Sequence, residues 1–168
     1  MKYWTLVFSL FTLLAPGQAS AQDADDILTA EFAFEIRAEL APAITLGKTS
    51  DGERLSIPIT GGTFAGPAIR GEILPGGADY QLVRPDGVRE LRAVYMIRTD
   101  DGALINVINE GIIVAPELNN GESYIMTTPQ FRAPVGKYDW LNRNVFLSRI
   151  TGGLQDPPTV IIRVYRVQ

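Results

Sequence analysis

Residues 61–87 constrain the fold of this chain more than any other stretch. They read GGTFAGPAIRGEILPGGADYQLVRPDG and hold seven glycines and three prolines between short apolar runs. Glycine readily adopts positive φ and proline fixes φ, so both favour tight turns and bulges between strands. A segment this dense in turn residues cannot contain a long helix, and it predicts short β-strands in the middle of the chain.

Apolar and polar residues alternate in short runs along the rest of the chain. Over residues 91–98, for example, Leu91, Ala93, Tyr95 and Ile97 share one face. Asp101-Gly102 is typical of a hairpin turn, and so is Asn120-Gly121. The runs number about nine and recur every ~10 residues, a spacing that favours a barrel or a sandwich.

These patterns predict an all-β fold: a single closed antiparallel β-barrel of about eight to ten strands. A barrel is favoured over a sandwich because closure removes exposed strand edges. The last strand, TVIIRVYRVQ, is long and apolar, so we expect it to pair with the N-terminal strand and to close the sheet.

Three further stretches follow residues 61–87: RELRAVYMIRTDDGALINVINEGI, YIMTTPQFRAP and YDWLNRNVFLSRI. With these motifs in this order, the chain from about Phe32 to its C-terminus resembles the bacterial and fungal domain-of-unknown-function family 3237, also called uncharacterised protein family 0311. The most specific parts of the resemblance are residues 61–87, TDDGALI and WLNR. It implies a compact antiparallel β-barrel and no particular activity, because the family is named for the lack of one.

The N-terminus has the pattern of a secretory signal. Lys2 precedes the apolar run TLVFSLFTLLA, and Ala19-Ser20-Ala21 matches an A-x-A cleavage site. The apolar run is shorter than the ~20 residues needed to cross a bilayer. We therefore predict a signal peptide over residues 1–21, a flexible leader over 22–30 and one β-barrel domain over 31–168. The protein is then periplasmic or secreted, with no membrane span after cleavage.

Composition excludes several classes of chemistry. The chain has no His and no Cys, so it cannot form a Ser-His-Asp triad, a Cys nucleophile, a disulfide or an ordinary zinc site. Neither Lys48 nor Lys137 lies in a glycine-rich phosphate loop. The formal net charge of −4 is poorly suited to binding nucleic acid. We expect no metal, no cofactor and no nucleic acid; a small-molecule ligand and a homodimer stay open.

Arg70 and Glu72 are the first candidate site residues. They lie two apart in AIRGEIL and share one face of a strand, with Ile69 and Ile73 on the other. Facing the barrel interior, the pair would orient a carbonyl or carboxylate ligand. Facing solvent, it would be an ordinary ion pair worth under ~1 kcal/mol. The sequence leaves both alternatives open.

Five other residues complete the candidate ligand site. Asp79 follows two glycines and is either a turn residue or part of a site. Tyr95 lies in mid-strand, and its hydroxyl needs a partner if it is buried. Trp140, Asn142 and Arg143 combine a ring, an amide and a cation, as pocket mouths often do.

Trp140 and Arg143 also have a structural interpretation, in which Trp140 plugs one barrel end and Arg143 pairs with an acid such as Asp139 or Glu110. We predict one cavity bordered by Arg70, Glu72, Tyr95 and Trp140, with Asp79 and Arg143 near its mouth and Asn142 beside them.

Three functions fit these features. The first is a module that binds a small apolar or aromatic molecule inside the barrel. The second is a cofactor-independent isomerase, cyclase or lyase that uses a carboxylate or Tyr with an Arg. The third is a structural envelope protein with a filled core. A cavity lined by unpaired polar groups favours the first two, and a raised carboxylate pKa inside it favours the enzyme. We favour the binding module.

Overall fold

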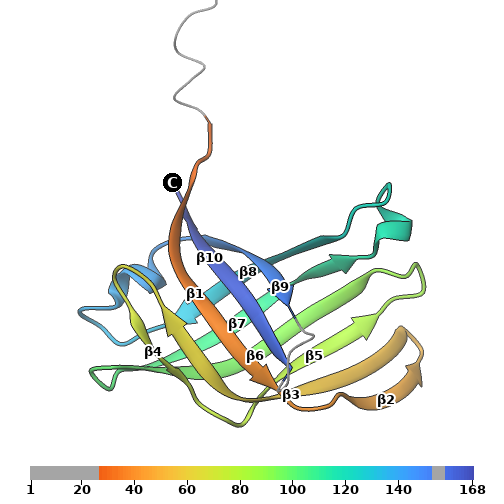
Figure 1. Ribbon diagram of the computed structural model, residues 1–168, viewed down its shortest axis with the longest axis horizontal. Helices are drawn as coiled ribbons and strands as arrows, with labels where there is room; N and C mark the ends of the chain where they lie inside the picture. The colour runs from red at the N-terminus through yellow and green to blue at the C-terminus, as the bar shows by residue number, and fades with distance from the viewer. Residues whose placement is uncertain (1–26, 153–157) are drawn as a thin grey trace, which may run out of the picture.

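The computed structural model describes residues 27–152 and 158–168, which form one antiparallel sheet of ten strands (Figure 1). Eight strands close the barrel in the order β1-β10-β9-β8-β7-β6-β4-β3, and β2 and β5 are added to it. The predicted closed β-barrel is confirmed. The strands are β1 Ala30–Leu40, β2 Ile44–Thr49, β3 Gly52–Ala65, β4 Arg70–Ile73, β5 Gly77–Val83, β6 Arg89–Thr99, β7 Leu104–Val114, β8 Tyr124–Arg132, β9 Phe146–Gly152 and β10 Thr159–Val167.

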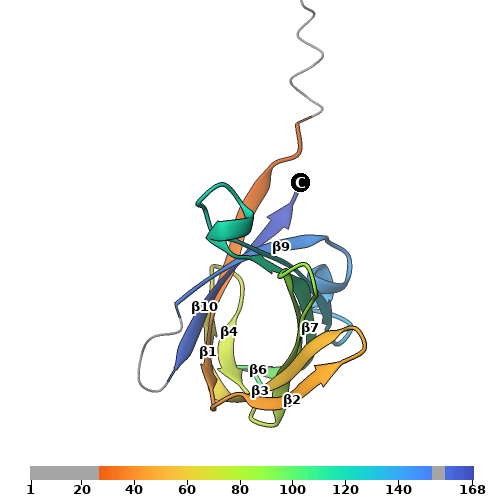
Figure 2. The same ribbon diagram turned by 90° about the vertical axis from the view of Figure 1, so that its right-hand side faces the viewer.

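The first and last strands close the barrel, as the sequence predicts. β1 pairs with β10 along its whole length, with Ile36 opposite Ile162. On its other edge β1 pairs with β3, where Ile36 lies opposite Phe64. Seen along the barrel axis, the strands form a ring in which β1 and β10 are neighbours (Figure 2). The predicted signal peptide, residues 1–21, lies outside the described residues, as do residues 22–26 of the predicted leader.

Strand β3 changes partners halfway along its length. Its first half pairs with β2 and β5, and its second half pairs with β1 and β4. Gly62 lies where β3 meets β1, with a φ of 128°. A Cβ atom there would lie 2.0 Å from the Arg37 carbonyl oxygen, so only glycine lets the two backbones approach this closely.

Aromatic side chains fill one end of the barrel, which we call the filled end. Phe131 packs against Phe146 and Phe34, with ring centroids 5.1 and 5.6 Å apart. The 3-10 turn η3, Asp139–Asn142, covers this end, and Trp140 packs its ring against Phe34 and Phe146. Trp140 therefore lies where the alternative interpretation places it, as a plug at one end of the barrel.

Small and polar side chains lie among the apolar ones at the inward positions of the opposite end. Ala38, Ala93 and Thr127 are three of these smaller inward residues. We call this the hollow end, because side chains of this size leave space on the barrel axis. Within the described residues, no helix is long and apolar enough to span a bilayer.

Candidate functional site

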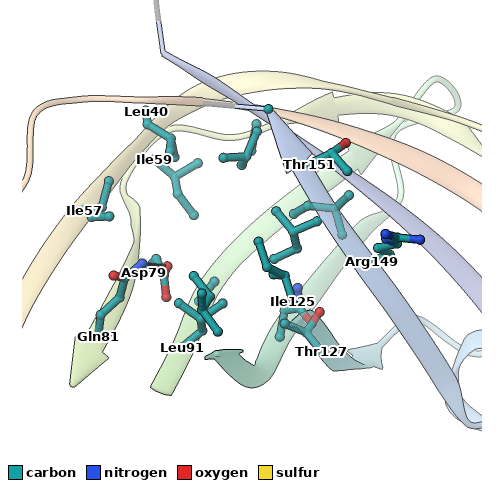
Figure 3. A pocket seen from close by; sticks show the side chains of 18 of the residues that line it. Leu40, Ile57, Ile59, Asp79, Gln81, Leu91, Ile125, Thr127, Arg149 and Thr151 are labelled. Atoms are coloured by element: carbon teal, nitrogen blue, oxygen red, sulfur yellow. Dashed lines mark hydrogen bonds between the residues drawn. The ribbon is translucent and has the colours of Figure 1, made fainter. Parts of the chain in front are cut away.

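A cavity of about 360 Å³ occupies the hollow end of the barrel. Small-molecule sites commonly have volumes of about 300–1,000 Å³ and mostly apolar walls. In Figure 3, Leu40, Ile57 and Ile59 line one side of this cavity, and Ile125, Thr127 and Thr151 line another. The described lining residues with apolar side chains are Ala38, Leu40, Ile57, Ile59, Leu91, Ala93, Ile113, Ile125, Ile150, Val160 and Ile162.

A polar row crosses the floor of this apolar cavity. Asp79 on β5 lies opposite Ala93 on β6, and Ala93 lies opposite Asn109 on β7. Strand residues opposite one another point to the same face, so all three face the interior. The alanine methyl group leaves space between the carboxylate and the amide. Tyr95 points inward two residues further along β6.

Two hydrogen bonds fix the carboxylate of Asp79. Its Oδ1 accepts from the backbone N–H of Arg92 over 3.1 Å, and its Oδ2 accepts from Gln81 Nε2 over 2.6 Å. Gln81 Oε1 in turn accepts from Arg89 Nη1 over 3.2 Å, which fixes the orientation of the amide. Arg89 therefore contacts the carboxylate only through Gln81.

Burial is the main influence on the pKa of Asp79. It raises this pKa above the ordinary value, while the bonds from Gln81 and Arg92 and the charge of Arg89 act in the opposite direction. Burial, and then the charge of Asp79, raise the pKa of Tyr95 far above its usual range. The Tyr95 hydroxyl consequently keeps its proton and can donate a hydrogen bond.

Tyr95 and Asn109 each carry a buried polar atom without a partner. Both residues are 3% exposed, and neither Tyr95 Oη nor Asn109 Oδ1 has a hydrogen-bond partner among the described residues. Buried polar groups are nearly always paired, and an unpaired one typically costs about 1–3 kcal/mol. Two such atoms on one cavity are the feature of this end of the barrel that packing within the described residues leaves unexplained.

The interior of the cavity contains no fixed positive charge within the described part of the chain. Arg149 is the one Lys or Arg among its described lining residues, and the side chain of Arg149 is exposed. Its strand neighbours Ser148 and Ile150 face inward, so alternation directs Arg149 outward. Among the same residues, no group of three or more acidic side chains could hold a metal ion.

The family model for proteins of unknown function DUF3237 matches residues 28–167. The chain belongs to the DUF3237 family. A UPF0311 protein of Bradyrhizobium diazoefficiens is 36% identical over an alignment of 151 residues that covers 83% of this chain and 97% of the relative. The predicted family membership is confirmed.

Solved structures with the same fold include a β-barrel-like protein of Acinetobacter baumannii. It has a TM-score of 0.75 and 34% identity, over 84% of this chain and 97% of the other. An enzyme from Penicillium herquei has a TM-score of 0.67 and 23% identity, over 84% of this chain and 95% of the other. This second likeness shows a shared fold alone.

Two of the candidate residues named from the sequence of this DUF3237 chain face the cavity. Asp79 and Tyr95 line it together, and Asp79 is part of the floor rather than of a turn. Their role toward a ligand stays a prediction.

The expectation that Arg70 and Glu72 border the cavity is wrong. Their side chains are 72% and 51% exposed on the outer face, where Arg70 lies 3.7 Å from Asp100 and Glu72 pairs with Arg98. Ile69 and Ile73 occupy the inner face in their place, at 4% and 3% exposure. Burying two isoleucines is more favourable than burying an ion pair, and this preference sets the orientation of the strand.

The three candidates near η3 also lie away from the cavity. Trp140 packs in the filled end, and Arg143 pairs with Asp139. Asn142 bonds the backbone of Ala133 in both directions, over 2.9 Å each, and so holds the turn against β8. The structural interpretation of this segment therefore accounts for all three residues.

Asn109, Gln81 and Ala93 are the cavity residues that the candidate site omitted. Asn109 had a signal in the sequence: it continues the inward face of Ile105 and Val107 in INVINEGI, where an apolar residue belongs. Gln81 shares a strand face with Asp79 in the same way. Ala93 was placed on the correct face, but nothing in the sequence showed that its neighbours would be too small to fill the space.

Proposed function

We propose that this barrel binds a small, largely apolar molecule in the cavity at its hollow end. The observation that carries the proposal is the pair of unpaired buried atoms, Tyr95 Oη and Asn109 Oδ1, on an otherwise apolar wall. A ligand with one polar group would satisfy these atoms and cover the apolar wall with its body. A protein with a wholly filled core would have neither the space nor the unpaired atoms.

Tyr95→Phe separates a binding role from a structural one. The substitution removes a hydroxyl that has no partner in the described protein, so thermal stability should stay the same or rise. Affinity for 2-naphthalenemethanol, a neutral aromatic alcohol, should fall about 2- to 10-fold in titration calorimetry, since a neutral hydrogen bond contributes about 0.5–1.5 kcal/mol.

Tyr138→Phe is the matched control. Tyr138 Oη donates to Asp101 Oδ1 over 2.9 Å, outside the cavity. This variant should lose stability and keep its affinity for the alcohol. An alcohol that binds Tyr95→Phe as tightly as it binds the native protein would contradict the proposed role of Tyr95 in binding.

A second candidate is proton transfer by Asp79, as in a cofactor-independent isomerase, cyclase or lyase. The observation that favours it is the raised pKa of this buried carboxyl beside Tyr95 on the cavity. The arginine expected to hold an enolate has no equivalent among the described groups of the interior. The reaction would therefore depend on Asp79, Tyr95 and Asn109.

The two candidates differ in what happens to the bound molecule. A ligand recovered by native mass spectrometry from protein purified from its own cells can be incubated with native protein and with Asp79→Asn. Conversion to a product by the native protein alone supports catalysis. Recovery of the unchanged molecule from both supports binding only.

We also propose that the chain is exported, on the strength of the signal pattern in residues 1–21. N-terminal sequencing of the protein from periplasmic and culture fractions should begin at Gln22. A protein that retains Met1 in a membrane fraction would contradict export.

A further inference from the structure

The polar groups on the cavity floor include several hydrogen-bond acceptors. Asp79 contributes a carboxylate and Asn109 an unpaired carbonyl oxygen, and these two residues flank the small Ala93 on the neighbouring strands. Tyr95 can donate or accept. A ligand group placed over Ala93 therefore lies between a carboxylate and an amide.

The hydrogen bonds of Asp79 leave its carboxylate able to accept more. Each oxygen accepts one bond, from the Arg92 N–H or from Gln81, and a carboxylate oxygen has two lone pairs. Both partners are uncharged groups. Arg89 is the cation linked to Asp79 by hydrogen bonds, and the link is indirect: Arg89 donates to Gln81, and Gln81 donates to Asp79.

Charge complementarity then decides which ligand group fits. A carboxylate or phosphate placed beside the Asp79 carboxylate would be repelled by it, and the half-buried Arg89, the cation nearest to Asp79, is bonded to Gln81 and does not line the cavity. An alcohol could donate one hydrogen bond. A protonated amine could donate to both Asp79 and Asn109 and would place a positive charge directly beside the carboxylate.

We infer that the ligand of this cavity carries a protonated amine, held between the Asp79 carboxylate and Asn109 Oδ1, on an apolar or aromatic body. The inference rests on the proposed binding function and specifies its ligand class. The apolar walls take the body of the molecule.

The test uses four compounds that share a naphthalene ring and differ in one substituent: 2-naphthylmethylamine, 2-naphthalenemethanol, 2-naphthoate and 2-methylnaphthalene. Titration calorimetry of the full barrel at neutral pH should rank the amine first, about 10-fold or more above the alcohol, because a charge-assisted bond is about twice as strong as a neutral one. The carboxylate should bind most weakly. Asp79→Asn should remove most of the amine's advantage over the alcohol, whereas Asp86→Asn, in an exposed turn, should preserve it.

Acidification provides a second measurement on the native protein. Two titratable groups on β6, Tyr95 and Arg89, interact electrostatically with Asp79. On β3, the residue opposite Asp79 is the apolar Ile57. Asp79 is the one carboxyl group among them, so amine affinity should fall as pH drops through its pKa while alcohol affinity changes little.

The outcomes separate the two proposals. An alcohol or carboxylate that binds as tightly as the amine overturns the amine inference and leaves the binding function in place. Failure of all four compounds to bind overturns both. If Asp79→Asn unfolds, the ranking on the native protein and its pH dependence still decide the question.

Discussion

Asp79 and Asn109 flank the methyl group of Ala93 in one cross-strand row of the barrel. Three adjacent strands thus present an acid, a methyl group and an amide to the same interior space. The row combines polar groups with the free volume of the cavity. The size of residue 93 should therefore control access to both polar groups.

Ala93→Leu should block the cavity without unfolding the barrel. Three added carbon atoms would project into existing space, so the thermal midpoint should stay the same or rise. Affinity for 2-naphthalenemethanol should fall at least about 10-fold, because the added side chain occupies the ligand's position. Val94→Leu is the matched control on the same strand and the opposite face, and it should bind normally. Unchanged affinity in Ala93→Leu would place the ligand elsewhere.

The stability difference between native protein and Asp79→Asn should depend on pH. Burial raises the folded-state pKa of Asp79, so folding favours its protonated form. That contribution is fully present below the unfolded-state pKa and is lost as pH rises through the folded-state pKa. The variant should therefore gain stability relative to the native protein as pH rises from about 4, near the unfolded-state pKa, through the raised folded-state pKa. Urea unfolding at several pH values measures this, and a flat difference would show that Asp79 is not held in a desolvated site.

Sequence periodicity was enough to predict the barrel because side chains alternate between the two faces of a strand, and this alternation depends only on residues close in sequence. Alternation placed Leu91, Ala93, Tyr95 and Ile97 on one face, and that face is the interior. The pairing of β10 with β1 followed from the need to cover the edge of a long apolar strand.

The sequence was a poorer guide to which face of a strand points inward where either face could have been buried. In β4, Arg70 and Glu72 competed with Ile69 and Ile73, and only the assembled barrel shows that the isoleucines are inside. The cavity itself depends on small or polar inward residues from different strands, such as Ala38, Ala93 and Thr127. These residues meet at one end of the barrel because of the register between strands, and a single sequence does not reveal that register.

Phe131→Ala should destabilise the protein and spare the cavity. Phe131 is 1% exposed and contacts two aromatic rings in the filled end. Truncating a buried phenylalanine costs about 3–5 kcal/mol, through lost burial and the cavity left behind. Urea unfolding should show a loss of this size, whereas affinity for 2-naphthalenemethanol in the folded protein should hold within about 2-fold. A milder Phe131→Leu variant extends the test if the alanine variant is too unstable, and a large loss of affinity in either would contradict the independence of the two ends.

Asp101 and Asp100 are adjacent acids in the TDDG turn with different numbers of partners. Asp101 accepts hydrogen bonds from Thr99 Oγ1, Lys137 Nζ and Tyr138 Oη, and so ties the β6–β7 hairpin to the segment before η3. Asp100 makes one long ion pair, with Arg70 at 3.7 Å. Asp101→Asn should therefore lower the thermal midpoint clearly more than Asp100→Asn does.

The pH dependence of the Asp101→Asn effect follows from the same contacts. Hydrogen bonds from Lys137, Thr99 and Tyr138 hold the folded-state pKa of Asp101 far below its ordinary value. Its stabilising contribution is fully present above the unfolded-state pKa of about 3.9 and is lost as pH falls toward the folded-state pKa. Thermal unfolding of native protein and Asp101→Asn should differ most near neutral pH and converge as pH drops below about 4. Asp100→Asn should differ little from the native protein at either pH, because an exposed, long ion pair adds little. Equal effects of the two substitutions would show that Asp101 does not anchor the hairpin.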